Sequence, residues 1–422
     1  MYRIRREIET FKSCPPSMRV LLVSNMIYAL VLPVIEIFVA AYVMRNSHDV
    51  GKVVTYQLAV YAATPVAFFV NGLLLGRFGV KRMYAAGMVL SGAAMMMLMR
   101  SGVLTSAGIA GAGVAMGFAT GLFWANRGFL ALATTRNENR NYFYGLEMFS
   151  GTLTAVVVPA AIGWFIAGTV RYGWLGGIAN HAYRVIAITV FALTAVSAGI
   201  LQRGSFRNPA HTRFVFFHFD PLWRRMLQLA ALKGLTHVYI LTAPALLVLL
   251  LVGKEGTLGA MQAAGGILSA CMLYAVGRAA APRHREGLLS FAIVLFFAGA
   301  ILNAVLFNAA GVFAFMGCLV VSKPLLDLAY NPIELQVVDT VAAVEGRSEY
   351  AYFFNHEFGL FAGRFAGCVL FLAIVHWGSG IAALRYALPI VALAQMLSIP
   401  LAARISKELM QNTAELDLVR IS

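Results

Sequence analysis

Twelve apolar stretches, each 17 to 29 residues long, divide this sequence. About 20 apolar residues are needed for a helix to cross the hydrocarbon core of a bilayer. The stretches lack the alternation of apolar and polar residues that is typical of outer-membrane barrel strands. We therefore expect an all-α membrane protein with twelve transmembrane helices. The stretches lie at 20–44, 52–75, 83–99, 103–131, 142–168, 183–202, 226–252, 257–277, 287–308, 310–334, 350–377 and 380–402.

The composition excludes the soluble classes of protein. Apolar residues make up 60% and charged residues 12% of the 422 residues, against about 45–50% and about 25% in ordinary globular domains. A soluble chain of this length needs more polar surface than that. A soluble enzyme and a nucleic-acid binder are thereby excluded, although the net charge is +15. We expect no nucleic-acid partner, no cofactor and no metal site.

The distribution of basic residues predicts the orientation in the membrane. If both termini are cytoplasmic, the cytoplasmic segments hold 22 of the 33 Lys and Arg residues, and the opposite side holds 7. Such an excess follows the positive-inside rule. The N-terminus is basic, with Arg3, Arg5 and Arg6, and leads into a full spanning stretch, which indicates a retained first helix. We expect a multi-pass protein of the plasma membrane, in bacteria the inner membrane.

The longest polar interruption falls in the middle of the chain and predicts its domains. Residues 1–202 would form an N-terminal six-helix bundle, 203–225 a cytoplasmic linker, and 226–422 a C-terminal six-helix bundle with a cytoplasmic tail. Tyr142-Phe143-Tyr144 with Glu147 also matches Tyr352-Phe353-Phe354 with Glu357, at an offset of 210 residues. Parallel six-helix repeats are a known plan of secondary transporters.

The segment between the second and third stretches carries a recognisable pattern. It reads Gly72-Leu-Leu-Leu-Gly76-Arg77-Phe-Gly79-Val-Lys81-Arg82 and resembles the loop 2–3 signature of the major facilitator superfamily. The resemblance implies two pseudo-symmetric six-helix bundles, with Gly72, Arg77, Gly79, Lys81 and Arg82 in a loop that gates the conformational change. Gly76 stands where that family usually has Asp, an acid that helps latch the cytoplasmic side. This chain therefore lacks the latch or supplies it elsewhere.

Several ionisable or polar residues lie inside the apolar stretches. A charge at the bilayer centre costs at least ~2.5–3.5 kcal/mol, so such residues are candidates for function by default. Four acids and four bases are among them, a set that could be paired in the resting protein. The candidates for substrate binding or proton coupling are Asn25, Glu36, Arg127, Glu147, Lys233, His237, Lys323, Asp327, His356, Glu357 and Arg364.

Some of these candidates have two interpretations. Glu36 shares a helix face with Asn25, and is either a site carboxylate or an acid near the outer interface paired with a loop base. Lys233 and His237 are four residues apart on one face. Lys233 either faces a cavity or snorkels to the headgroups, and His237 is either a cavity residue or a satisfied packing residue.

The remaining charges concentrate in the fourth, fifth, tenth and eleventh stretches. Lys323 and Asp327 can pair within one helix, and Glu357 and Arg364 share a face. In the resembled fold these four helices close the cytoplasmic mouth, and Arg127 resembles an arginine linked there to proton coupling. We expect Arg127–Glu147 and the group of Lys323, Asp327, His356, Glu357 and Arg364 to form a cytoplasmic gate network. Static ion pairs that only fix the helix packing are the alternative.

These features favour a secondary transporter over an enzyme. No phosphate-binding Gly-x-x-x-x-Gly-Lys-Ser/Thr loop is present, so energy would come from a gradient. We expect a monomer that moves a small polar or charged organic solute by alternating access, coupled to protons and in contact with membrane lipids. A proton-coupled multidrug or metabolite efflux pump is the alternative. A membrane-embedded transferase and a channel fit less well, because no catalytic cluster or ion filter is recognisable.

Overall fold

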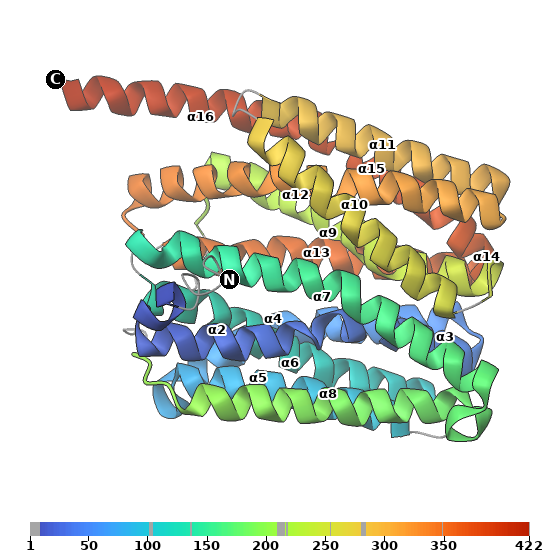
Figure 1. Cartoon of the computed structure of the whole chain (residues 1–422). Helices are drawn as coiled ribbons and strands as arrows, with labels where there is room; N and C mark the ends of the chain where they lie inside the picture. Colours follow the sequence, from blue (N-terminus) through green and yellow to red (C-terminus); the bar gives the residue numbers. More distant parts are fainter. Residues whose placement is uncertain are drawn as a thin grey trace. The chain divides into compact units, whose positions relative to one another are not determined.

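The computed structural model describes residues 9–100, 104–135, 137–208, 216, 218–253, 255–279, 284–347 and 349–421. Arg3, Arg5 and Arg6 of the basic N-terminus lie outside the described residues, as do residues 209–215 and 217 of the expected linker. In the described part every regular element is a helix (Figure 1). The all-α fold class is therefore confirmed.

The first half of the chain supplies six spanning helices. The first of these is broken, and a short 3-10 helix lies in the connection before the sixth. The first span is built from three pieces, α2 (Pro16–Ala29), the π-helical η1 (Val34–Phe38) and α3 (Val39–Ser47). It is followed by α4 (Val50–Phe78), α5 (Val80–Arg100), α6 (Ser106–Thr134), α7 (Asn137–Tyr172), the short η2 (Trp174–Gly177) and α8 (Ala179–Gln202).

The second half also has six spanning helices, of which the last is broken. Its helices are α9 (Pro221–Leu251), α10 (Glu255–Ala279), α11 (Arg285–Leu306), α12 (Ala309–Glu345) and α13 (Glu349–Trp377). The last span is built from α14 (Gly380–Ala382), the π-helical η4 (Ala383–Ala387), α15 (Leu388–Gln395) and α16 (Ser398–Ile421).

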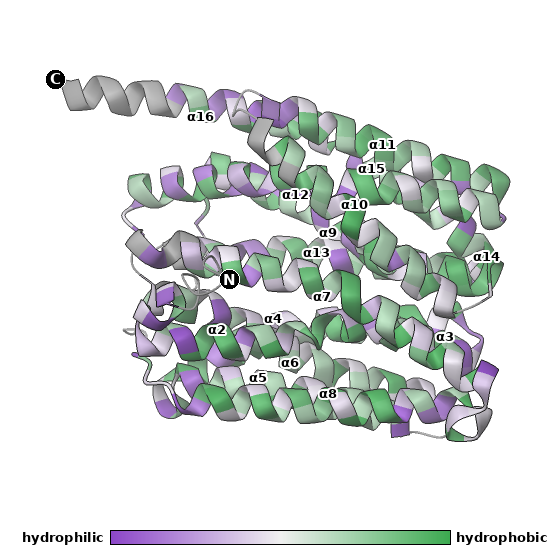
Figure 2. Ribbon diagram, in the orientation of Figure 1, coloured by the Kyte–Doolittle hydropathy of each residue, from purple (hydrophilic) through white to green (hydrophobic). Residues whose placement is uncertain are grey.

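Twelve helices in the described part are long and apolar enough to cross a membrane, which confirms the twelve predicted spans and a multi-pass membrane protein. Figure 2 shows hydrophobic residues along the helices and hydrophilic ones gathered toward their ends. A tight turn joins α11 to α12. Phe307 adopts a left-handed conformation and the Asn308 side chain accepts a hydrogen bond from the Gly311 amide at 3.0 Å, which caps α12.

Two helix boundaries differ from the prediction. Helix α9 begins at Pro221, inside the expected linker, because Pro fits the first helical position and the Asp220 carboxylate accepts from the Leu222 amide at 2.7 Å. Helix α12 ends at Glu345 rather than at 334, where Gly346 has a φ of 62° and terminates it.

The helices group into two compact units. The first unit comprises Met1–Ser47 and Ala59–Thr212, and the second comprises His48–Leu58 and Arg213–Ser422. In the first unit α5 packs between α6 and α8. Ser24 and Ser197 join α2 to α8 because each hydroxyl donates to the other's carbonyl, at 2.9 and 2.8 Å.

Close helix packing depends on glycines in both units. On α6, a Cβ at Gly117 would overlap the Val60 carbonyl of α4, and one at Gly121 would lie 2.7 Å from the Thr64 oxygen. In the second unit, Gly234 of α9 and Gly363 of α13 lie against the opposing backbone at Leu360 and Ala231. Small residues permit such approach between helices, so the contact surfaces leave no room for a side chain.

We predict that Gly363→Ala lowers the thermal-unfolding midpoint of the purified protein. The added methyl group would meet the Ala231 carbonyl, and overpacking of this kind costs about 1–3 kcal/mol. Gly317→Ala on α12 is the control, because a Cβ there meets nothing within 4 Å. Equal midpoints for the two variants would mean that α9 and α13 are not packed as described.

Candidate functional site

The charged site of the first unit centres on the carboxylate of Glu147 in α7. Glu147 Oε1 accepts hydrogen bonds from Asn25 Nδ2 at 2.8 Å and from Arg127 Nε at 3.1 Å. Glu147 Oε2 lies 2.7 Å from a terminal nitrogen of Arg127. Both oxygens therefore face the guanidinium in a two-pronged pair, the strongest geometry available to these groups.

Aromatic side chains complete this cluster, here named the Arg127–Glu147 network. Tyr84 of α5 is fully buried and donates its hydroxyl to Asn25 Oδ1 at 2.8 Å. The Arg127 guanidinium lies 5.1 Å from the ring centre of Trp124, a cation–π contact. The side chains of Arg127 and Glu147 are 29% and 11% exposed. The network is thus fixed from four helices but open on the side of the arginine.

The second unit holds its own ion pair across two helices. Lys233 Nζ of α9 lies 3.1 Å from Asp327 Oδ1 and donates to Asn331 Oδ1 at 3.4 Å, both on α12. Its ammonium also lies 3.8 Å from the centre of the Tyr330 ring. Lys233 therefore engages α12 instead of extending along its own helix toward the headgroups. The ion pair that Asp327 forms is with Lys233, not with Lys323 as its i,i+4 spacing allowed.

Through its hydroxyl, Tyr330 also belongs to a buried triad with His356 and Glu334. The Tyr330 hydroxyl lies 2.6 Å from His356 Nε2, and His356 Nδ1 lies 3.3 Å from Glu334 Oε1. With a neutral imidazole, an Nδ1–H directed at Glu334 leaves Nε2 to accept the tyrosine O–H. The side chains of His356 and Glu334 are 7% and 13% exposed. This arrangement can hold a proton on the carboxylate or on the imidazole.

A third ion pair lies on α13 itself. Arg364 donates from a terminal nitrogen to Glu357 Oε2 at 3.4 Å, across two helical turns. Lys233, Arg364 and Glu357 all act electrostatically on the triad. The second unit therefore brings Lys233, Asp327, His356, Glu357 and Arg364 together.

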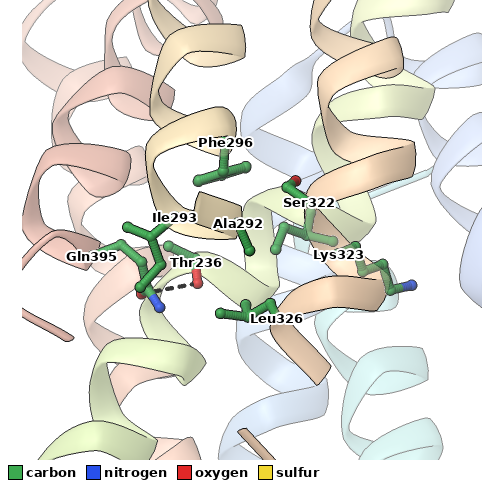
Figure 3. Close-up of a pocket in the computed structure, with 9 residues that line it drawn as sticks. Thr236, Ala292, Ile293, Phe296, Ser322, Lys323, Leu326 and Gln395 are labelled. Atoms are coloured by element: carbon green, nitrogen blue, oxygen red, sulfur yellow. Dashed lines mark hydrogen bonds between the residues drawn. The ribbon is translucent and has the colours of Figure 1, made fainter. Parts of the chain in front are cut away.

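Three candidates lie apart from these contacts. Glu36 is exposed in η1, eleven residues beyond Asn25. His237 lies one turn beyond Lys233, and its buried Nδ1 has no hydrogen-bond partner among the described residues. Lys323 lines a cavity of about 10 Å³, room for a single water. Figure 3 shows its amino group directed away from this cavity, where Thr236 donates to Gln395 Oε1 at 3.2 Å.

The structure corrects the expected gate loop, because α4 continues through Gly72 and Arg77 and α5 already contains Lys81 and Arg82. Only Gly79 lies between the two helices, and this junction contacts the end of α8 and the residues that follow it. Gly79 has a φ of 75°, which favours glycine, and the next amide, that of Val80, donates to Asn208 Oδ1 at 3.0 Å. Lys81 Nζ donates to the carbonyls of Gln202 and Gly204 at 3.1 and 3.0 Å. Gln202 is the last residue of α8, and a positive charge is favourable at this end of a helix. These contacts hold residues 202–208 against the start of α5.

Sequence reasoning missed Tyr84, Tyr330 and Glu334 as members of the networks. Glu334 is the last residue of the span expected at 310–334. Its spacing of four from Tyr330, parallel to that of Asp327 and Asn331, is a usable signal for one polar face of α12.

No family model matches this chain. It is 22% identical over 362 residues to the uncharacterized protein YqgE of Bacillus subtilis (strain 168), covering 83% of this chain and 80% of that protein. Its fold is similar to that of a solved structure described as a bacterial metal transporter, with a TM-score of 0.62 and 16% identity, over 93% of this chain and 99% of that one. This likeness shows that the two chains share a fold.

We predict a large coupling energy between Arg127 and Glu147. Removing one partner leaves the other charge without its counter-charge. The losses of stability in Arg127→Gln and in Glu147→Gln should therefore add up to more than the loss in the double variant. The two single variants and the double variant are compared by thermal unfolding in detergent. The expected coupling is about 0.5–3 kcal/mol.

The matched control is the more exposed pair Arg225–Glu408, whose side chains are 39% and 25% exposed. Its coupling should be smaller, because exposed ion pairs contribute little. Strict additivity at Arg127 and Glu147 would contradict the network.

Proposed function

We propose that this protein is a secondary transporter that moves a small polar or charged organic solute by alternating access, coupled to protons. The observation that carries the proposal is the pairing of charges within the spanning helices. Three ion pairs and one buried Tyr–His–Glu triad lie in helices that cross the membrane. Charges held at such cost are usually retained for a function.

The chemistry of the pairs favours an organic solute with a charged group. Each carboxylate of the networks already faces a nitrogen: Glu147 faces Arg127, Asp327 faces Lys233, Glu357 faces Arg364, and Glu334 faces His356. A carboxylate on the solute can take the place of Glu147 beside Arg127, and an ammonium can take the place of Lys233 beside Asp327. Exchange of partners keeps every charge compensated, which limits the cost of binding.

The triad is the proposed site of proton coupling. Glu334 and His356 can exchange one proton, because His356 Nδ1 lies 3.3 Å from Glu334 Oε1. Tyr330 contacts both His356, through its hydroxyl, and the ammonium of Lys233, through its ring. Protonation of Glu334 would remove a negative charge near Lys233 and so weaken the hold on that cation. Lys233 then keeps its ion pair with Asp327 and is freer to bind an anionic solute. Binding of proton and solute are coupled in this way.

A metal cation is the second candidate substrate, because the solved structure of similar fold is described as a metal transporter. Within the described residues, no group of three or more His, Cys, Asp or Glu side chains is placed to hold a metal ion. The nitrogens beside the four carboxylates would also compete with a cation. A proton-coupled efflux pump for drugs or metabolites remains the alternative within organic solutes.

A thermal-shift screen of the purified protein separates these candidates. We expect organic anions or zwitterions to raise the unfolding midpoint, by an amount that grows with ligand concentration. Solutes that stabilise the protein are then tested for uptake into liposomes with an imposed pH gradient. If divalent cations alone stabilise the protein and enter the liposomes, the organic-solute proposal is wrong.

We predict that Glu334→Gln separates solute movement from the pH gradient. The amide keeps the volume but cannot be deprotonated, so exchange of labelled for unlabelled solute should persist while accumulation driven by the gradient falls about tenfold or more. The control is Glu286→Gln, an exposed acid on α11, which should behave like wild type. Glu147→Gln and Glu357→Gln test the other two carboxylates in the same assay.

One outcome would contradict the coupling scheme, and a second would limit the role of the ion pairs. Full gradient-driven accumulation by Glu334→Gln would exclude Glu334 as the coupling site. Wild-type transport by Glu147→Gln and Glu357→Gln under a pH gradient would assign their ion pairs to helix packing alone.

A further inference from the structure

A shallow groove of about 480 Å³ runs along the surface between α5 and α8 of the first unit. Its floor and walls are small or apolar residues: Ala85, Ala86, Val89, Ala198 and Gly199. Arg82 and Gln202 line the same groove, and both are exposed. The groove thus combines an apolar bed with one cation and one amide.

The groove begins where both helices reach the end of their spans. Arg82 is the third residue of the span that starts at Val80, and Gln202 is the last residue of the span that ends there. Val89, at the other end of the lining, lies seven residues deeper, or about 10 Å along the helix axis. The polar end therefore lies where both apolar spans end, and the apolar part extends along the spans.

The surroundings of the polar end are strongly basic. Residues 75–89 and 198–208 contain five basic residues and no Asp or Glu: Arg77, Lys81, Arg82, Arg203 and Arg207. Lys81 is committed to the carbonyls that end α8. The four arginines are exposed, and a guanidinium binds phosphate through two parallel hydrogen bonds. This patch is complementary to an anionic headgroup.

We propose that this groove is a binding site for one anionic phospholipid. The phosphate lies at Arg82, Gln202 supplies hydrogen bonds to the headgroup or the ester region, and the first part of an acyl chain lies over Ala86 and Gly199. Basic pockets between membrane helices hold anionic headgroups in this manner. The site includes Arg82, so the bound lipid would lie beside Val80 and Lys81, which contact residues 202–208.

The proposal makes separate demands on the charge and on the groove. Arg82→Gln removes the cation and leaves the apolar bed. Gly199→Leu fills the bed and leaves the cation, and it fits because a Cβ at Gly199 meets nothing within 4 Å. Both residues are exposed, so neither change should prevent folding.

The test is native mass spectrometry of the purified full chain with equal amounts of phosphatidylglycerol and phosphatidylcholine that carry the same acyl chains. Wild-type protein should retain phosphatidylglycerol preferentially. Arg82→Gln should weaken that retention about fivefold, the factor expected for one basic contact at a membrane surface. Gly199→Leu should reduce the retention of this lipid as well.

Two control variants distinguish a site from diffuse attraction. Arg100→Gln removes an exposed base at the other end of α5. Gly317→Leu replaces an exposed glycine on α12, where a Cβ meets nothing within 4 Å, as at Gly199. Neither should change the preference. Equal retention of the two lipids by wild type, or equal losses in Arg82→Gln and Arg100→Gln, would overturn the proposal, since the bases would then act only through their summed charge.

Discussion

A charge inside a membrane-spanning helix needs a counter-charge or a hydrogen-bond partner from another part of the protein, because the hydrocarbon supplies neither. This constraint explains why the charged residues within the spanning helices are paired. Arg127 and Glu147 join α6 to α7, and Lys233 and Asp327 join α9 to α12. The pairs therefore determine which helices are adjacent and which faces they present. Glycines such as Gly234 and Gly363 bring the backbones close enough for short side-chain contacts.

The same pairs are suited to exchange partners. None of the three carboxylates in ion pairs is fully enclosed: Glu147 is 11%, Glu357 31% and Asp327 42% exposed in their side chains. Glu334 and His356 are held more tightly, and the fully buried Tyr330 links them to the cation of Lys233. In the proposed mechanism, the more exposed pair binds the charged solute and the buried triad next to it takes up the proton.

The spans were predictable because each depends on local composition and length alone. Partners across helices were not, since they depend on the rotation of each helix about its axis. Asp327 could pair with Lys323 by spacing, yet it pairs with Lys233 of another helix. Glu334 was missed because hydropathy marked it as the end of a span, whereas α12 continues to Glu345.

The most direct test of the account is solute-driven proton movement without an imposed gradient. Liposomes that contain the purified protein and a trapped pH dye are mixed with a solute that stabilises the protein in the screen. The account predicts a change of internal pH that follows solute entry in a fixed ratio and is absent with Glu334→Gln. Solute entry that leaves internal pH unchanged in the wild-type protein would contradict it.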